Sequence, residues 1–348
     1  MNKEKLEEIK NLVKTGEEYQ SFREDEKVKD KLHLLCVCGS YSYGTEREDS
    51  DIDLRGAVAL DPCYTNGTLK DWEIRTFSET DTVIRSYRKM LHLMSEGDPD
   101  TLSLVGQNLD NYLYLSNLGK ELVIYHSDFI GARGVYKSFI GFSNSQMRRL
   151  ELAELGRLEE KPELKRELKG SILKNAIYNM SIKYPTIELE NLNFEFDISE
   201  NEEEPIKIKS VSGSDITIED YFNVAKDIKS IINSFGKKGK RNEKKSDFKL
   251  NKHCMHTVRS MLMCIECLET GIVKTYREND LPLLRKILNG EFMDADGKMG
   301  TEFYELVEDL RKKSEYAFKN SILPMEPDMK KVSDMMTEFV LYDLKKEP

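Results

Sequence analysis

The sequence predicts an α+β protein, and three observations support this fold class. Short apolar and alternating runs, bounded by glycine and charged residues, lie between residues 32 and 84 and are typical of strands. Beyond about residue 110 the apolar residues recur mainly at helical spacing. The chain has 348 residues, of which 39% are hydrophobic, so it can bury the core of one large domain or of two ordinary ones.

The N-terminal third supplies the predicted strands. Residues 32–38 are a continuous apolar run, which indicates a buried strand that ends at a glycine. Residues 51–60 indicate a second strand, and residues 69–84 indicate one or two more. A helix is expected to start at Ser86 and to close at Gly97.

Helical periodicity dominates the remainder of the chain. It predicts helices at residues 1–30, 135–155, 151–169, 172–180, 218–235, 250–268, 281–288, 301–320 and 329–344. Two segments within residues 187–218 alternate apolar and polar side chains, which indicates a hairpin. We therefore expect three regions: a core at 1–110, a helical region with the hairpin at 111–247, and a C-terminal helical region at 248–348.

Charge and composition narrow the function classes. The net charge of -10 argues against a protein that coats nucleic acid non-specifically, because such proteins carry a basic excess. No apolar run is long enough for a transmembrane helix, and the N-terminus lacks the apolar core of a signal peptide. The six cysteines fall mostly within apolar patterns, which predicts free, packed thiols rather than disulfides or zinc ligands. We therefore expect a cytoplasmic protein without a membrane partner.

Residues 236–249 form the most basic segment of the chain. They hold two glycines and seven Lys or Arg residues within fourteen positions. This composition predicts a flexible loop, and binding of nucleic-acid phosphates is the functional alternative.

The stretch from Leu34 to Val58 carries the strongest functional pattern. A buried strand ends at Gly39-Ser40, and Asp51 and Asp53 follow between apolar flanks. On a strand, carboxylates at i and i+2 point the same way, roughly 6.5–7 Å apart, and both can reach a pair of metal ions. The structural alternative is a surface loop with aspartates as turn residues. The spacing favours a site for two magnesium ions, with manganese as a substitute.

The residues before the aspartates are suited to binding a triphosphate. Gly39 lets the backbone approach phosphate groups closely, and Ser40 and Thr45 add hydroxyl groups. Backbone N–H groups at the start of a following helix can bind an anion. We therefore predict that this segment binds the nucleotide.

A third carboxylate is expected on a neighbouring strand, as a metal ligand or as a general base. The candidates are Glu73, Glu79 and Asp81. Asp81 directly precedes the apolar residues 82–84, so we expect it to lie on a strand and prefer it.

A second cluster of polar residues lies on the predicted helix 250–268. Lys252, His253, His256 and Arg259 occupy positions i, i+1, i+4 and i+7. Lys252, His256 and Arg259 share a stripe that could bind the β- and γ-phosphates. The alternative is a helix with a packed apolar face and solvated cations.

Several segments resemble one known family. Residues 39–56, GSYSYGTEREDSDIDLRG, resemble the DNA polymerase β-like nucleotidyltransferase superfamily and, within it, the RlaP family associated with RNA repair. Residues 81–105 resemble that family's third-carboxylate strand with the helix and turn that follow it. Residues 250–273 resemble its Lys-His-x-x-His-x-x-Arg helix, and residues 281–292 and 321–328 resemble its C-terminal segments.

The resemblance implies a fold and a set of site residues. It implies a small mixed sheet flanked by helices, and a C-terminal helical region that closes the nucleotide cleft. It also implies magnesium, a nucleoside triphosphate such as ATP, and Asp51, Asp53 and Asp81 as the carboxylate triad.

These observations lead us to expect a metal-dependent nucleotidyltransferase. It would move a nucleoside monophosphate from the triphosphate to a hydroxyl acceptor, such as an RNA end in RNA repair. The alternatives are nucleotidylation of a protein or small molecule, second-messenger synthesis, and a non-catalytic nucleotide-binding module. The sequence leaves the acceptor, the base of the nucleotide and the oligomeric state open.

Overall fold

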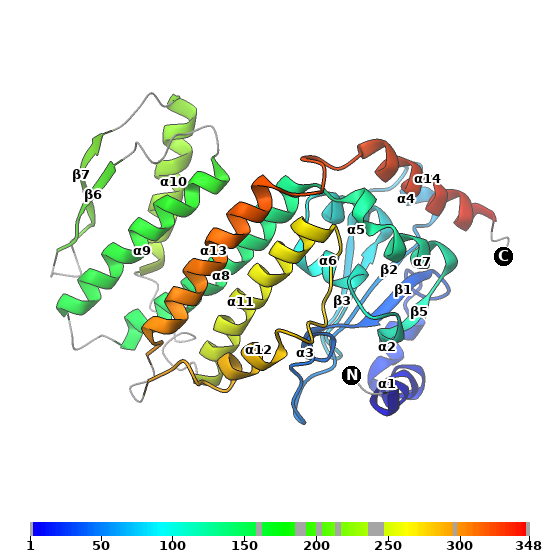
Figure 1. Ribbon diagram of the computed structural model, residues 1–348. Coiled ribbons are helices and arrows are strands. Elements are labelled where there is room, and N and C mark those ends of the chain that lie inside the picture. The colour runs from blue at the N-terminus through cyan, green and yellow to red at the C-terminus, as the bar shows by residue number, and fades with distance from the viewer. Residues whose placement is uncertain are drawn as a thin grey trace. The chain divides into compact units, whose positions relative to one another are not determined.

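The computed structural model describes residues 3–157, 162–184, 193–199, 204–212, 217–235, 247–294 and 298–345 (Figure 1). The chain divides into two compact units. The first comprises Met1–Ile140, Arg259–Arg285 and Leu306–Pro348, and the second comprises Gly141–Val258 and Lys286–Glu305. Both units are discontinuous in the sequence, whereas the predicted regions 1–110, 111–247 and 248–348 are consecutive.

The first unit is built on a five-stranded sheet with the order β3-β4-β2-β1-β5 (Figure 1). Its strands are β1 (Leu32–Val37), β2 (Leu54–Val58), β3 (Ile74–Phe77), β4 (Thr82–Ser86) and β5 (Tyr112–Leu115). β2 and β4 are parallel and the other neighbouring pairs are antiparallel, which confirms the predicted α+β fold with a mixed sheet. Leu54 pairs with Thr82, so the first residues of β2 and β4 lie side by side.

One face of the sheet packs against the N-terminal helix α1 (Lys3–Thr15). Leu6, Ile9 and Val13 form the apolar stripe of α1, at the spacing of a helix that buries one face. They belong to the same core cluster as Leu35 and Leu54 of the sheet. Side chains alternate between the two faces of a strand, so the residues that neighbour Leu35 and Leu54 in sequence point to the opposite face.

The expected helix over residues 1–30 is interrupted. α1 is followed by η1 (Glu17–Tyr19) and α2 (Gln20–Glu24). Gly16 separates α1 from η1 in an extended conformation, with φ -63° and ψ 139°. Glycine disfavours the helix interior because it loses the most backbone freedom there, so the break falls at this residue.

The helix expected after Ser86 is α5 (Tyr87–Ser95), and it packs against β2 and β4. The Ser86 hydroxyl caps it by accepting a hydrogen bond from the backbone N–H of Lys89. Gly97, at φ 73°, follows its end, as predicted. The C-terminal helix α14 (Met329–Lys345) packs on α5, where the rings of Phe339 and Tyr87 stack 5.5 Å apart. These contacts tie α14 to the part of the first unit that contains the sheet.

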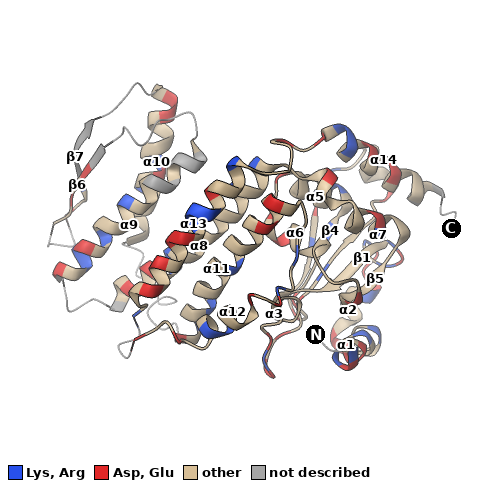
Figure 2. Ribbon diagram, in the orientation of Figure 1, with Lys and Arg blue, Asp and Glu red and all other residues tan. Residues whose placement is uncertain are grey.

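The remaining helices of the first unit are short. They are α3 (Gly39–Tyr43), α4 (Pro62–Thr65), α6 (Pro99–Val105), η2 (Leu109–Asn111), α7 (Asn117–Ile124) and η3 (His126–Phe129). Four helices have residues in both units, namely α8 (Ala132–Arg157), α11 (Asp247–Thr270), α12 (Leu281–Leu288) and α13 (Thr301–Lys319). Figure 2 shows acidic side chains in the first half of α13 and basic ones in its second half. This order complements the helix dipole.

The second unit contains the predicted hairpin and two helices of its own. β6 (Asn193–Asp197) and β7 (Lys207–Ser212) pair antiparallel, which confirms the hairpin prediction. α9 (Pro162–Lys183) packs against α10 (Ile218–Phe235), with Leu173 and Ile228 in their shared core. Residues 236–246 of the predicted basic segment 236–249 lie outside the described residues.

Two further predictions concern membranes and cysteines. Across the part of the chain that the structure describes, we find no helix with the length and apolar character needed to span a bilayer. All six cysteines are free thiols, and five of them are buried. Burial raises the pKa of Cys267 to about 12, so this thiol stays protonated and packs as an apolar group. The prediction of packed, unpaired cysteines is confirmed.

His126 of η3 is expected to make the protein less stable in acid. Its buried ring donates from Nδ1 to the carbonyl of Val123 (2.8 Å) and accepts at Nε2 from the N–H of Val273 (3.1 Å). Burial lowers the pKa of His126, so the unfolded chain binds a proton at a higher pH than the folded chain does. This contribution to stability is complete above the unfolded pKa of roughly 6.5 and is lost as the pH falls through the folded pKa.

Urea unfolding of the wild type and of His126→Asn at pH 7.5 and pH 5.5 measures this effect. The wild type should lose more free energy of unfolding between the two pH values than the variant does. An equal loss in both proteins would show that another group controls the acid response.

Candidate catalytic site

The candidate site begins where β1 turns into α3. Gly39 starts α3 with φ 62°, a left-handed conformation that side chains other than glycine rarely adopt. A Cβ atom on Gly39 would lie 1.9 Å from Oδ2 of Asp53. The glycine therefore allows the turn and leaves room for the Asp53 carboxylate directly beside it.

Asp51 and Asp53 lie just before β2 rather than within the strand that we predicted for residues 51–60. β2 begins at Leu54, although the carbonyl of Asp53 still accepts a hydrogen bond from the N–H of Cys38 (2.8 Å). Asp53 is half-buried beside Gly39, and Asp51 is exposed. The hydrogen bond from Cys38 holds Asp53 in the register of β2. Asp51 lies in the loop that leads to β2.

Asp81 also precedes its strand, whereas we expected it on the strand itself. It has φ 44° and leads directly into β4. Its carbonyl accepts a hydrogen bond from the N–H of Leu54 (3.3 Å), which links it to the start of β2. Since β2 and β4 are parallel, their first residues meet at one edge of the sheet, and Asp81 comes close to Asp53.

The alternative third carboxylates lie elsewhere. Glu73 forms an ion pair with Lys89 (3.0 Å), and its carbonyl accepts from the N–H of Ser86. Ser86 is the last residue of β4, so Glu73 lies at the opposite end of that strand from Asp81. Glu79 is exposed in the turn between β3 and β4. Asp81 is exposed as well, but its contacts with Leu54 and Arg55 place it beside Asp53, which favours it among the three candidates.

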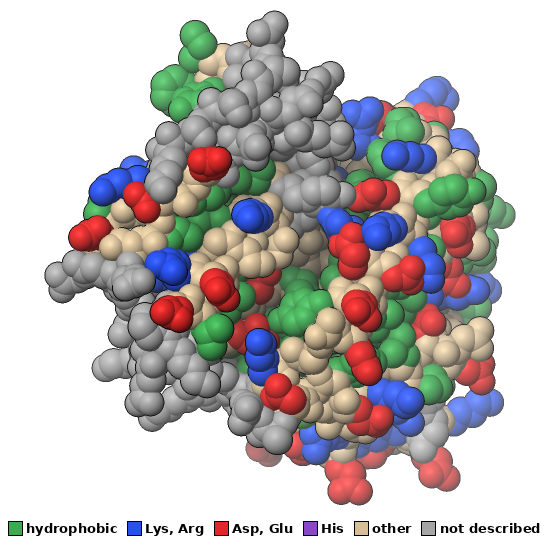
Figure 3. Space-filling view, turned by 60° about the vertical axis from the view of Figure 1, so that its left-hand side comes forward, with side chains coloured by type: hydrophobic (Ala, Val, Ile, Leu, Met, Phe, Trp, Pro, Cys, Tyr) green, Lys and Arg blue, Asp and Glu red, His purple; other side chains and the backbone are tan. Residues whose placement is uncertain are grey.

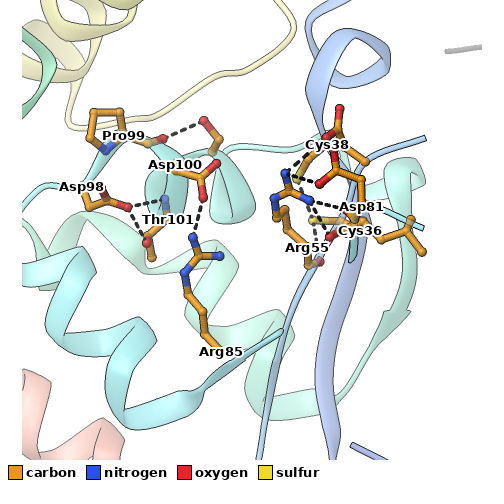
Figure 4. A network of polar contacts seen from close by, with 12 residues as sticks. Cys36, Cys38, Arg55, Asp81, Arg85, Asp98, Pro99, Asp100 and Thr101 are labelled. Carbon is orange, nitrogen blue, oxygen red and sulfur yellow. Dashed lines mark hydrogen bonds and ion pairs between the residues drawn. The ribbon is translucent and has the colours of Figure 1, made fainter. Parts of the chain in front are cut away.

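Arg55 connects Asp53 and Asp81. From the sequence it was a candidate for supporting phosphate charge, with a surface role as the alternative, and its contacts with these carboxylates were not predicted. Its Nη2 lies 3.2 Å from Oδ1 of Asp53 and 3.4 Å from Oδ1 of Asp81. Its Nη1 donates to the carbonyl oxygens of Leu54 (3.0 Å) and Asp81 (2.5 Å). Figure 4 shows the guanidinium beside Asp81. One cation therefore bridges two of the three predicted carboxylates.

A fourth carboxylate, Asp100 in the first turn of α6, interacts electrostatically with Arg55. It forms an ion pair with Arg85, whose side chain is only 7% exposed on β4 (Figure 4). Burial lowers the pKa of Arg55, but nearby negative groups raise it overall. Asp100 has the largest effect among these groups. The cap of α6 is Asp98, which accepts a hydrogen bond from the N–H of Thr101 (2.8 Å). A charged residue such as Arg85 within an apolar strand was the signal that could have led to this pair.

The loop after α3 is held by the C-terminal part of the first unit. Gly44, at φ 73°, lies against the side chains of Tyr276 and Leu281. Its carbonyl accepts a hydrogen bond from Nη2 of Arg285 (2.9 Å). Residues more than 200 positions away thus fix the end of the turn that starts at Gly39.

Arg259 packs in the interior of the first unit. Its guanidinium carbon lies 3.5 Å from the centroid of the Tyr43 ring in α3, and the residue is 7% exposed. The hydroxyl of Tyr43 is within hydrogen-bond distance of Ser103 (3.1 Å). This cation–π contact stabilises the position of Tyr43, the last residue of α3.

The other predicted nucleotide-binding residues are spread over both units. Ser40 is half-buried in α3 and Thr45 is buried, with its N–H donating to the carbonyl of Ser40 (3.0 Å). Lys252 is exposed and His256 is half-buried. Of the three residues of the predicted cation stripe on α11, Lys252 and His256 belong to the second unit and Arg259 belongs to the first.

The chemistry of the donors suits magnesium. Asp51, Asp53 and Asp81 offer hard carboxylate oxygens, which this ion prefers. Among the described residues, however, no three His, Cys, Asp or Glu side chains are already grouped as a metal site. The guanidinium of Arg55 stands between two of the carboxylates instead.

The two cysteines next to the site do not provide a nucleophile. The Sγ atoms of Cys36 and Cys38 lie 3.6 Å apart, and both residues are buried. The hydrogen bond to Cys36 and burial raise the pKa of the Cys38 thiol well above its ordinary value. A thiol acts as a nucleophile or metal ligand as the thiolate, so this pair is a packing element.

Comparison with known proteins identifies one family. The model of "RlaP: RNA repair pathway DNA polymerase beta family" matches residues 4–179, just over half of the chain. The matched segment contains Gly39, Asp51, Asp53 and Asp81 and stops before α11. A search of curated proteins found no match.

Proposed function

Because the chain belongs to the RlaP family of polymerase β-like proteins of an RNA repair pathway, we propose that it is a metal-dependent nucleotidyltransferase. It transfers a nucleoside monophosphate from a nucleoside triphosphate to a hydroxyl acceptor, and we take this acceptor to be an RNA end. The observation that carries the proposal is the position of Asp53 against Gly39, with Asp81 at the neighbouring strand start.

The reaction is an in-line displacement at the α-phosphorus. The acceptor oxygen forms a bond to phosphorus, the bond to the bridging oxygen of pyrophosphate breaks, and the acceptor proton is taken up by a base. Such transfers are catalysed mainly by positioning and by neutralising charge. Asp51, Asp53 and Asp81 would hold two magnesium ions, which would shield the triphosphate and activate the acceptor hydroxyl.

The chain's own groups have distinct roles in this proposal. The turn at Gly39 and Ser40 brings backbone N–H groups and a hydroxyl to the triphosphate. Asp81, whose side chain is 59% exposed, is accessible to accept the acceptor proton. Lys252 and His256 are kept as predicted phosphate ligands on the pattern of the sequence alone, and Arg259 would support α3 through Tyr43.

A transfer assay tests the proposal. The full chain is incubated with Mg²⁺, with each of the four α-labelled nucleoside triphosphates, and with RNAs that end in a 3′-hydroxyl or a 3′-phosphate. We expect label on the hydroxyl-ended RNA only, and no transfer in EDTA or with Asp51→Asn/Asp53→Asn. Equal labelling by the double variant would refute the proposal.

Transfer to a protein or small molecule, or second-messenger synthesis, is the second candidate. It draws support from the net charge of -10 and from the face in Figure 3, where acidic and basic side chains are interspersed among the coloured atoms. Neither feature is that of a bulk RNA binder. RNA binding in a gel shift that is lost when Lys237, Lys238, Lys240, Lys244 and Lys245 are neutralised would favour the RNA acceptor.

A non-catalytic module is the third candidate. Metal-dependent nucleotide binding without turnover on any acceptor would support it. The presence of all three predicted carboxylates favours catalysis instead.

A further inference from the structure

Arg55 points to the face of the sheet that carries the candidate site. It stands two residues after Asp53 and pairs with Cys36 on one side and Val83 on the other. Its neighbour Leu54 faces the α1 core, so alternation directs Arg55 to the opposite face. The side chain is 15% exposed, which leaves the guanidinium close to the site but shielded from most of the solvent.

The contacts of Arg55 are made at both ends of its planar guanidinium. Nη2 is shared between the carboxylates of Asp53 (3.2 Å) and Asp81 (3.4 Å). Nη1 is fixed by the carbonyl oxygens of Leu54 and Asp81. The carboxylate contacts are long for charged hydrogen bonds, and both backbone contacts are shorter than they are, so the backbone anchors the cation and the carboxylates gather around it.

The charge around Arg55 is strongly negative. Burial disfavours the charged guanidinium, but Asp100, Asp53, Cys38 and Asp81 together outweigh burial and raise the pKa of Arg55. Carboxylates this close would repel one another without a cation among them. For Asp53 and Asp81 the structure supplies Arg55.

We propose that Arg55 is the internal counter-ion of the catalytic carboxylates: it holds Asp53 and Asp81 together before metal binds, and it weakens metal binding. This inference rests on the proposed function, since it assumes that these carboxylates take divalent cations. The positive guanidinium repels an incoming divalent ion and competes with it for the same oxygens. Binding of the metal therefore requires Asp53 and Asp81 to exchange one cation for another.

The consequence is that removing the charge should tighten metal binding. We expect Arg55→Gln to bind Mn²⁺ about tenfold more tightly than the wild type, because a like charge in contact with the ligands is removed. Arg55→Lys keeps the charge and should stay within about threefold of the wild type. Without metal, Arg55→Gln should melt at a lower temperature, and Mn²⁺ should raise its melting temperature more than that of the wild type.

Arg277 provides a matched control for the structural effect of removing a buried arginine. Its side chain is 10% exposed and forms ion pairs with two carboxylates, Glu266 and Asp280. Arg277→Gln should lower the melting temperature but leave Mn²⁺ affinity unchanged, since its partners are not the predicted metal ligands.

The test is isothermal titration of Mn²⁺ into the full chain, without nucleotide, for the wild type and these variants. Arg55→Gln binding that is equal to or weaker than that of the wild type overturns the counter-ion role. Asp51→Asn/Asp53→Asn separates this outcome from failure of the proposed function. If the double variant keeps wild-type Mn²⁺ affinity, or if the wild type binds no Mn²⁺, both proposals fail together.

A measurement on the wild type covers the case in which Arg55→Gln does not fold. Exchange of the Arg55 guanidinium protons with solvent can be followed by NMR, with the signals assigned through Arg55→Lys. We expect slow exchange without Mg²⁺ and faster exchange with it, as the carboxylates leave the guanidinium. Exchange that does not change with Mg²⁺ overturns the proposal.

Discussion

Replacing Asp53 by asparagine is expected to lower the rate of nucleotidyl transfer by about three orders of magnitude or more. Asparagine keeps the size of the side chain, so it fits beside Gly39 and preserves the ladder bond from Cys38 to the Asp53 carbonyl. It removes the negative charge that would hold a magnesium ion. Single-turnover transfer at saturating triphosphate measures the loss, and circular dichroism checks that the fold is retained.

Asp49→Asn is the matched control for this prediction. Asp49 lies in the same loop, but its side chain is 86% exposed and pairs only loosely with Arg47 at 3.9 Å. We expect its transfer rate to stay within about twofold of the wild type, as for surface changes outside a site. Transfer by Asp53→Asn within tenfold of the wild type would mean that this carboxylate is not a ligand of the catalytic metal.

Replacing Gly39 by alanine is expected to have the second largest effect. The new Cβ would lie 1.9 Å from Oδ2 of Asp53, and φ 62° is already unfavourable for alanine. The left-handed conformation alone costs about 1–2 kcal/mol, and the collision must also displace the carboxylate. We therefore expect a loss of transfer similar to that of Asp53→Asn, together with a loss of about 2–4 kcal/mol in the free energy of unfolding.

Gly67→Ala isolates the conformational part of this effect, without a steric collision. Gly67 has φ 80°, but nothing lies within 4 Å of the position of its Cβ. It should lose about 1–2 kcal/mol of stability and keep full transfer activity. Chemical denaturation and the transfer assay on both variants provide the comparison. If Gly39→Ala behaves like Gly67→Ala in both, the contact between Gly39 and Asp53 has no catalytic importance.

The sequence predicted the elements of the first unit well because their signals are local. The apolar run before Gly39, the alternation around β3 and β4, and the Ser86 cap each depend on a few neighbouring residues. The same holds for the Gly39 and Asp53 pair, whose spacing indicated a turn next to a strand. The errors at Asp51, Asp53 and Asp81 are of one kind, since each carboxylate lies just before a strand that we extended to include it.

The contacts that the sequence did not identify are those between residues that are distant in the chain. Arg55 and Asp81 are 26 positions apart, and they meet because β2 and β4 are parallel neighbours. Asp100 meets Arg85 because α6 places its first turn over β4. The stripe prediction had Arg259 bind phosphates, and its alternative had the cations solvated. In the structure Arg259 is buried, with its guanidinium over the ring of Tyr43.

By itself, the sequence determined the fold class and the type of chemistry. Carboxylate oxygens and a glycine turn at a fixed spacing led us to predict a site for cations and phosphates. Only the tertiary structure decided how the charges are balanced: it brings Arg55 between Asp53 and Asp81 and pairs Asp100 with Arg85. The physical reason is that charge interactions depend on distance in space, and the order of strands in the sheet, rather than their order in the chain, sets those distances.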